Sequence, residues 1–248
     1  MKRILVAAAM AAAAITTLSL TVPGAASAGT SSEAASGHVF RSYTKTMAGY
    51  EMTGGGWRFR YIKTTYTVPR CVTPLESAAR ITMVLGGKNG SVYLSPYDNG
   101  GSIEYWLSVW DYSQNLYIPQ SVGDKITISI YYDRQTGKVF LTAVNLNTGH
   151  KATVALGVKS WVFARARLVA GGPTWSTWNF ASKDTRLWAF TDTTLTSYSG
   201  YHGAILGPWN TIRIIGTRTG TSAGKVVLWP TWPWNNAHNF GVWWRAAS

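Results

Sequence analysis

The sequence has a single cysteine, few acidic residues and no group of side chains typical of a metal site. Cys71 is the only cysteine among 248 residues, so the fold cannot contain an internal disulfide. The four histidines lie far apart, and no His/Cys/Asp/Glu cluster has the spacing of metal ligands, so we expect neither a metal nor a cofactor. A nucleophile-elbow motif is also absent, which argues against a Ser-His-Asp hydrolase.

Long apolar runs are missing as well, except at the start of the chain. Lys2 and Arg3 precede an apolar stretch over residues 4–20, and Ala26-Ser27-Ala28 provides the small residues of a cleavage site. This layout is typical of a secretory signal peptide over residues 1–28. We therefore expect a secreted, extracellular protein without membrane insertion, in which residues 29–46 are a flexible lead or a short propeptide.

Acidic residues are scarce: 10 Asp and Glu stand against 23 Lys and Arg, a formal net charge of +13. Such an excess favours anionic partners. The basic residues are scattered, however, and in WRFRYIK (57–63) they alternate with aromatic residues. On a strand this alternation places Trp57, Phe59 and Tyr61 on an inner face and Arg58 and Arg60 on a solvated face, which disfavours nucleic-acid binding.

What the sequence does contain is a series of short β-rich segments separated by Gly, Asn and Pro turns. Asn99-Gly100-Gly101 and Asn147-Thr148-Gly149 are typical hairpin turns. No helix of useful length is predicted after the signal. The pattern indicates an all-antiparallel β-sandwich, with residues 47–248 as a single domain. The predicted strands of its first half are 57–68, 79–87, 91–98, 102–112, 124–133, 138–149 and 150–157.

The segment IEYWLSVWDY (103–112) has two unlike faces, because side chains alternate along a strand. One face has the ordinary core residues Ile103, Tyr105, Leu107 and Val109. The other mixes a carboxylate, a hydroxyl and two indoles, namely Glu104, Trp106, Ser108 and Trp110. This second face is either a binding groove or core with two polar exceptions.

Thirteen tryptophans are unusual for one chain. Exposed indoles stack on sugar rings, whereas buried ones fill a wide sandwich. We expect Trp161 and Trp188, on alternating strands, to be core residues. For Trp232 and Trp234, in the proline-broken WPTWPWNN, a glycan platform and core packing remain equal alternatives.

Several blocks between residues 47 and 245 resemble the glutamic peptidases, also called eqolisins, and their bacterial relatives. MAGYEMTGGGWRFRYIKTTYTVP is similar to that family's Trp-Ala-Gly-Tyr opening and the strand after it. Four further segments resemble later family segments in the same order, namely MVLGGKNGSVYLSPYD, YWLSVWDY, SVGDKITISI and ARLVAGG. The resemblance implies a concanavalin-like antiparallel β-sandwich of two bent sheets with a concave groove. It also implies a metal-free acid endopeptidase, in which a Glu acts as general base and a Gln stabilises the oxyanion.

The family's catalytic residues do not carry over to this chain. The glutamine position falls on Leu94, or on Ser95 if the segment shifts by one residue, and the glutamate position falls on Gly171. The supporting glutamate of Trp-Tyr-Glu-Trp falls on Ser108. Losing an oxyanion donor alone costs about 100- to 1000-fold in rate. The resemblance therefore implies the fold of a glutamic peptidase without the general-base Glu and the oxyanion-stabilising Gln.

We accordingly expect a monomeric pseudo-peptidase that binds an extended peptide or polysaccharide in an aromatic groove. The residues expected to line the groove are Trp57, Glu104, Trp106, Ser108, Trp110, Arg165 and Arg167. One alternative is an active acid endopeptidase with relocated catalytic residues, which would be Glu104, Asp98, Ser95 and Ser108. A second alternative is a lectin-like carbohydrate-binding protein, which rests on fold analogy.

Overall fold

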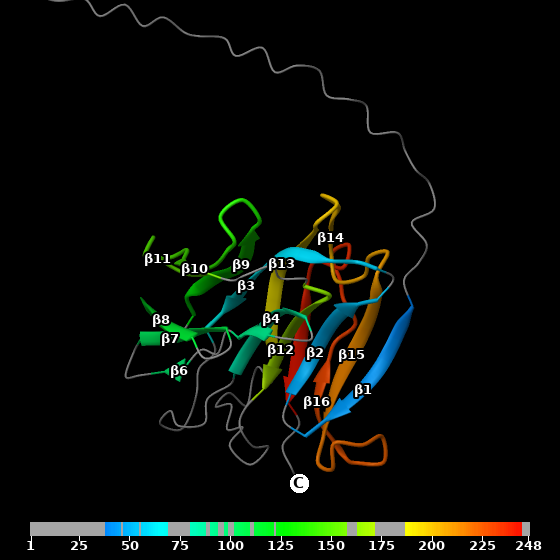
Figure 1. Ribbon diagram of the computed structural model, residues 1–248. Coiled ribbons are helices and arrows are strands. Elements are labelled where there is room, and N and C mark those ends of the chain that lie inside the picture. Colours follow the sequence, from blue (N-terminus) through cyan, green and yellow to red (C-terminus); the bar gives the residue numbers. More distant parts are fainter. Residues whose placement is uncertain are drawn as a thin grey trace, which may run out of the picture. The chain divides into compact units, whose positions relative to one another are not determined.

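The structure is a computed structural model, and it contains strands and turns (Figure 1). It describes residues 38–45, 47–54, 56–68, 80–87, 90–93, 97–98, 102–109, 112–121, 123–157, 163–171 and 187–244. Within these ranges lie seventeen strands and no helix, as the sequence predicts. In this part of the chain nothing qualifies as a membrane-spanning helix.

Strand pairing defines two layers. In hydrogen-bonding order, the first layer is β1 (Val39–Thr44), β15 (Asn210–Thr217), β2 (Met47–Thr53), β12 (Arg165–Gly171), β4 (Arg80–Gly87), β5 (Gly90–Tyr93), β7 (Ser102–Val109) and β8 (Tyr112–Pro119), with β6 (Tyr97–Asp98) also paired to β7. The central strands of this layer therefore come from distant parts of the sequence.

The second layer is, in order, β16 (Val226–Pro230), β17 (Phe240–Trp244), β13 (Leu187–Ser197), β3 (Phe59–Thr67), β9 (Lys125–Asp133), β10 (Lys138–Asn145) and β11 (Lys151–Gly157), with β14 (His202–Gly203) on β13. A short pairing between β15 and β16 joins the two layers. Together they form the predicted β-sandwich.

One strand pair departs from the all-antiparallel prediction. β1 runs parallel to β15, with Val39 opposite Thr211 and Thr44 opposite Gly216, whereas the other described pairs are antiparallel. The reason is that β15 is inserted between β1 and β2, which follow each other in the chain and run in opposite directions. A strand antiparallel to β2 is then parallel to β1.

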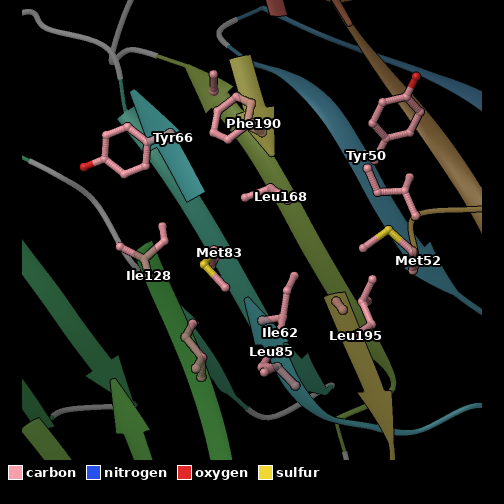
Figure 2. Packing of buried hydrophobic residues seen from close by; sticks show 14 of the residues in the cluster. Tyr50, Met52, Ile62, Tyr66, Met83, Leu85, Ile128, Leu168, Phe190 and Leu195 are labelled. Atoms are coloured by element: carbon pink, nitrogen blue, oxygen red, sulfur yellow. The ribbon is translucent and has the colours of Figure 1, made fainter. Parts of the chain in front are cut away.

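The hydrophobic core lies between the layers (Figure 2). β2, β12 and β4 contribute Tyr50, Met52, Leu168, Met83 and Leu85, which are all fully buried. They face Ile62, Tyr66, Ile128, Phe190 and Leu195 from β3, β9 and β13. The alternation predicted for residues 124–133 is confirmed, because Ile126, Ile128 and Ile130 are buried and the residues between them are not.

The predicted inner face of residues 57–68 is wrong in part. Phe59 is buried as expected, but Tyr61 is only partly buried and lies beside Tyr131, with ring centroids 6.4 Å apart. The register explains the change: Tyr61 lies opposite Thr196 and Phe59 opposite Ser197, so Arg60 is an extra residue in β3. Such a β-bulge reverses the inward alternation on one side of it. Ile62, rather than Tyr61, therefore enters the core.

Candidate functional site

Two arginines and a glutamate lie together on the face of the first layer that points away from the core. On β12, Ala166 and Leu168 are buried in the core, so Arg165 and Arg167 belong to the opposite face. Glu51 lies directly opposite Arg167 on β2, and directly opposed residues share a face. We call this surface, defined by Glu51, Arg165 and Arg167, the arginine face.

The register extends the arginine face to the strand that contains Ser108. Starting from Arg167, the opposed positions on successive strands are Val84, Tyr93, Ser108 and Ser113. The expected groove positions Arg167 and Ser108 thus fall in one row and are separated by two strands, β4 and β5, although the two residues are 59 positions apart in sequence.

The two predicted faces of residues 103–112 can be checked on the neighbouring strand β8. Leu116 and Ile118 are buried, whereas Asn115 is exposed and Tyr117 is 53% exposed. Trp106 lies opposite Asn115 and Glu104 lies opposite Tyr117. The β8 positions opposite Trp106 and Glu104 therefore lie on the side of the sheet that faces away from the core. The side chains of β7 are outside the described part of the structure, as is Trp110.

Glu51 is the centre of an ion-pair cluster. Arg167 donates through Nε to Glu51 Oε2 over 2.5 Å, and its Nη2 also contacts this oxygen. Nη1 of Arg165 lies 3.8 Å from Glu51 Oε1. The Glu51 side chain is only 6% exposed, whereas Arg167 is 31% and Arg165 is 50% exposed. The buried carboxylate thus holds Arg167 by a hydrogen bond and lies within ion-pair distance of Arg165, and both arginines reach toward solvent.

Sequence reasoning did not identify Glu51 as a site residue. It stands in the opening motif MAGYEMTGGG, between the core residues Tyr50 and Met52, and its alternation alone marks it as facing away from the core. Its partner Arg167 is 116 residues away. Only the pairing of β2 with β12 brings the two together, and the sequence pattern does not reveal that pairing.

Gly171 ends β12 on the arginine face, four residues beyond Arg167. It lies opposite Met47 on β2 and Arg80 on β4. Gly171 is the residue to which the family resemblance assigns the glutamate position, and it lies at the end of this strand. Leu94 and Ser95, the two candidates for the glutamine position, lie outside the described residues. Asp98 lies opposite Ile103 on β7, and its side chain is not among those described.

Trp57, the remaining predicted groove residue, packs at the margin of the core. Its ring centroid lies 5.6 Å from that of Trp209 and 5.5 Å from that of Tyr201. Trp209 is fully buried, so Trp57 covers an aromatic cluster that also contains Tyr201 and Phe59. Its described ring contacts therefore connect it to this cluster.

A second aromatic cluster surrounds Arg213 on β15. The guanidinium lies 4.3 Å from the ring centroid of Trp229 and 5.6 Å from that of Trp232, and it donates to the Pro230 carbonyl. The Tyr50 hydroxyl donates to the Thr231 carbonyl. Burial lowers the pKa of Arg213 and raises the pKa of Tyr50. These contacts fix the segment that joins β16 to β17.

Several tryptophans near this segment are exposed. Trp232 is 56%, Trp243 is 44% and Trp234 is 40% exposed, which excludes core packing for Trp232 and Trp234. Trp188 is only 4% exposed, so the prediction that it is a core residue is confirmed. Trp161 and Cys71 lie outside the described residues. Among the residues that the structure does describe, no three His, Cys, Asp or Glu side chains are placed to hold a metal ion.

Comparisons with known proteins support the fold. No protein-family model matches the chain, and a comparison with curated proteins finds no match. Among solved structures, the chain is similar to scytalido-glutamic peptidase bound to a transition state analog inhibitor, with a TM-score of 0.60 and 17% identity. It is also similar to SCP-B, a member of the eqolisin family of peptidases in complex with the tripeptide Ala-Ile-His, with a TM-score of 0.55 and 16% identity.

Each of these two likenesses covers 82% of this chain and 100% of the other chain. The protein therefore has an eqolisin-like β-sandwich fold. At these identities the likeness concerns the fold alone.

Proposed function

We propose that the protein is a secreted pseudo-peptidase that binds an extended polymer, foremost a peptide, on the arginine face of an eqolisin-like sandwich. The observation that carries the proposal is on β12. Gly171, to which the family resemblance assigns the position of the catalytic glutamate, is the last residue of this strand, and a glycine has no side chain that could accept a proton from water.

Glu51, the described carboxylate of the arginine face, is poorly placed to substitute for that glutamate. It lies opposite Arg167, and Gly171 follows four residues later, a separation of about 13 Å along the strand. Its Oε2 is bound by Arg167, and Arg165 faces its Oε1. This geometry supports a structural ion pair rather than a general base.

A peptide ligand is supported by what the structural neighbours hold. Scytalido-glutamic peptidase has been solved with a peptide based transition state analog, and SCP-B with a tripeptide. Transfer of peptide binding to this chain is part of the proposal. The register of β7 supports it further, because Ser108 belongs to the same row of opposed positions as Arg167, and Trp106 lies opposite the exposed Asn115.

A glycan ligand is the second candidate. The exposed indoles of Trp232, Trp234 and Trp243 favour it, because such rings stack on sugars. Retention of the protein on insoluble chitin, cellulose or peptidoglycan, lost in Trp232→Ala, would place ligand binding at these tryptophans instead of the arginine face.

Incubation with denatured casein tests the proposal against an active enzyme. We expect no cleavage between about pH 2.5 and 8, because the position of the general base is occupied by glycine. Immobilised denatured casein should nevertheless retain the protein, and Trp106→Ala should reduce this retention. Cleavage that disappears in Glu104→Gln would contradict the proposal and establish a peptidase with relocated catalytic residues.

Export is proposed from residues 1–28 alone. The basic start, the apolar stretch and the small residues before position 29 support it. N-terminal sequencing of protein recovered from culture medium should begin at Gly29. Recovery only inside cells, with Met1 retained, would contradict it.

A further inference from the structure

We propose that the arginine face carries a subsite for the carboxylate of an acidic side chain in the bound peptide, formed by Arg165 and supported by Arg167. This inference rests on the proposed peptide-binding function. It specifies the kind of peptide that the protein selects.

The first support is an excess of positive charge at the centre of the face. Among the described side chains of the face, two guanidinium groups meet one carboxylate, that of Glu51. Arg167 makes the close contact with Glu51, whereas Nη1 of Arg165 lies 3.8 Å away, beyond hydrogen-bond distance. Arg165 is also 50% exposed, so its N–H groups are accessible to a ligand. One anionic group would balance the charge.

The second support is that Arg167 is held in position before a ligand arrives, while Arg165 is attracted toward the same carboxylate. Glu51 belongs to β2, is almost fully buried and binds Arg167 through two nitrogens, Nε and Nη2. Its second oxygen attracts Arg165 and offsets the repulsion between the two cations. Preorganisation lowers the entropy that a side chain loses on binding, which favours affinity.

The third support comes from the residue types at the positions that lie opposite Arg167 and Arg165 on the neighbouring strands. In the row of Arg167, Ile212 on β15 lies opposite Glu51, and Val84 on β4 lies opposite Arg167. Opposite Arg165 lie Thr53 and Gly86, and Asn210 follows Thr53. Apart from Glu51, none of these residues is acidic. Ser108 belongs to the row of Arg167. Glu104 is four residues away from Ser108 along β7, so it lies about 13 Å from that row.

The chemistry of the pair favours a carboxylate. A guanidinium presents its donors in a planar fork that matches two carboxylate oxygens, and such charge-assisted hydrogen bonds are stronger than neutral ones. A single excess positive charge matches one Asp or Glu side chain better than it matches a polyanion. Together with the peptide ligands of the structural neighbours, this favours an acidic peptide over a uronic-acid polymer.

Fluorescence anisotropy with three labelled peptides tests the inference. The peptides share one neutral twelve-residue sequence and differ only at a central Glu, Gln or Lys. The mature protein should bind the Glu peptide about tenfold more tightly than the Gln peptide, as expected for one charge-assisted hydrogen-bond pair, and the Lys peptide most weakly. The preference should shrink at high salt, because exposed charges are screened.

Arg165→Gln should bind the Glu and Gln peptides equally. Lys151→Gln, which removes an exposed cation from β11 in the other layer, serves as the matched control and should keep the tenfold preference. Circular dichroism of each variant verifies folding. Arg165→Lys should retain part of the preference, because it keeps the charge but loses the planar fork.

The possible failures are distinguishable. Equal binding of all three peptides by the native protein overturns the acidic subsite and leaves the peptide-binding proposal standing. A preference for Glu that persists in Arg165→Gln also overturns the subsite. Binding of none of the peptides overturns the proposed function itself. Binding of polygalacturonate alone, lost in Arg165→Gln, overturns the choice of a peptide.

Discussion

Gly49→Ala will lower the free energy of unfolding by at least about 4 kcal/mol, which is an exceptional loss for one methyl group. Gly49 lies in β2 between β12 and β15, opposite Val169 and Ile214, and its φ of 151° is one that residues with a side chain rarely adopt. A Cβ at this position would lie 2.2 Å from the Leu168 carbonyl oxygen and 2.7 Å from Val169 Cα. Both are backbone atoms of a central strand, so no rotamer change relieves the clash.

Urea unfolding followed by tryptophan fluorescence measures this effect. Gly157→Ala is the matched control, because a Cβ on Gly157, at the end of β11, meets no atom within 4 Å and its φ is not positive. That variant should unfold within about 0.5 kcal/mol of the native protein. If both variants have the same midpoint of urea unfolding as the native protein, the close approach of β2 to β12 is contradicted.

Trp209→Ala should cost about 3 to 5 kcal/mol, because it empties the centre of an aromatic cluster. Trp209 is fully buried, and its ring centroid lies 5.2 Å from that of Phe59 and 5.6 Å from that of Tyr201. Its Nε1 donates to the Ile205 carbonyl over 3.1 Å. The ring also packs against Gly207, where a Cβ would come within 2.6 Å of it.

The cluster effect is best measured beside Trp243→Ala in β17. The Trp243 side chain is 44% exposed, so its removal should cost less than about 1 kcal/mol. Thermal and urea unfolding of the two variants should therefore differ clearly. Similar losses in both would mean that Trp209 does not have the packing role assigned to it.

The parts of the fold that depend on local alternation were predictable from the sequence. The strand with Ile126, Ile128 and Ile130 and the hairpin around Asn147-Thr148-Gly149 appear as β9, β10 and β11 in the expected order. Their turn residues and their period-two patterns lie within a few positions of each other. The resemblance to eqolisins supplied the arrangement of the layers, which no local pattern shows.

The features that depend on distant residues were not predictable. Glu51 and Arg167 meet because β2 and β12 pair across more than a hundred residues. The extra residue Arg60 in β3 changes which side chains enter the core, and it is visible only against β13. Arg213 contacts Trp229 and Trp232 because β15 pairs with β16 where the two layers join. In each case the missing information was the partner strand, not the residue type.

The insertion of β15 between β1 and β2 has a consequence for synthesis. β2, among the first strands to leave the ribosome, lies between β12 and β15, and β3 pairs with β13 from the same late part of the chain. Non-local pairing of this kind folds slowly. The early strands therefore cannot complete their sheets until most of the polypeptide has been made. For the proposed export, this means that the polypeptide would still be open, and able to pass through a translocation channel, when its synthesis is nearly complete.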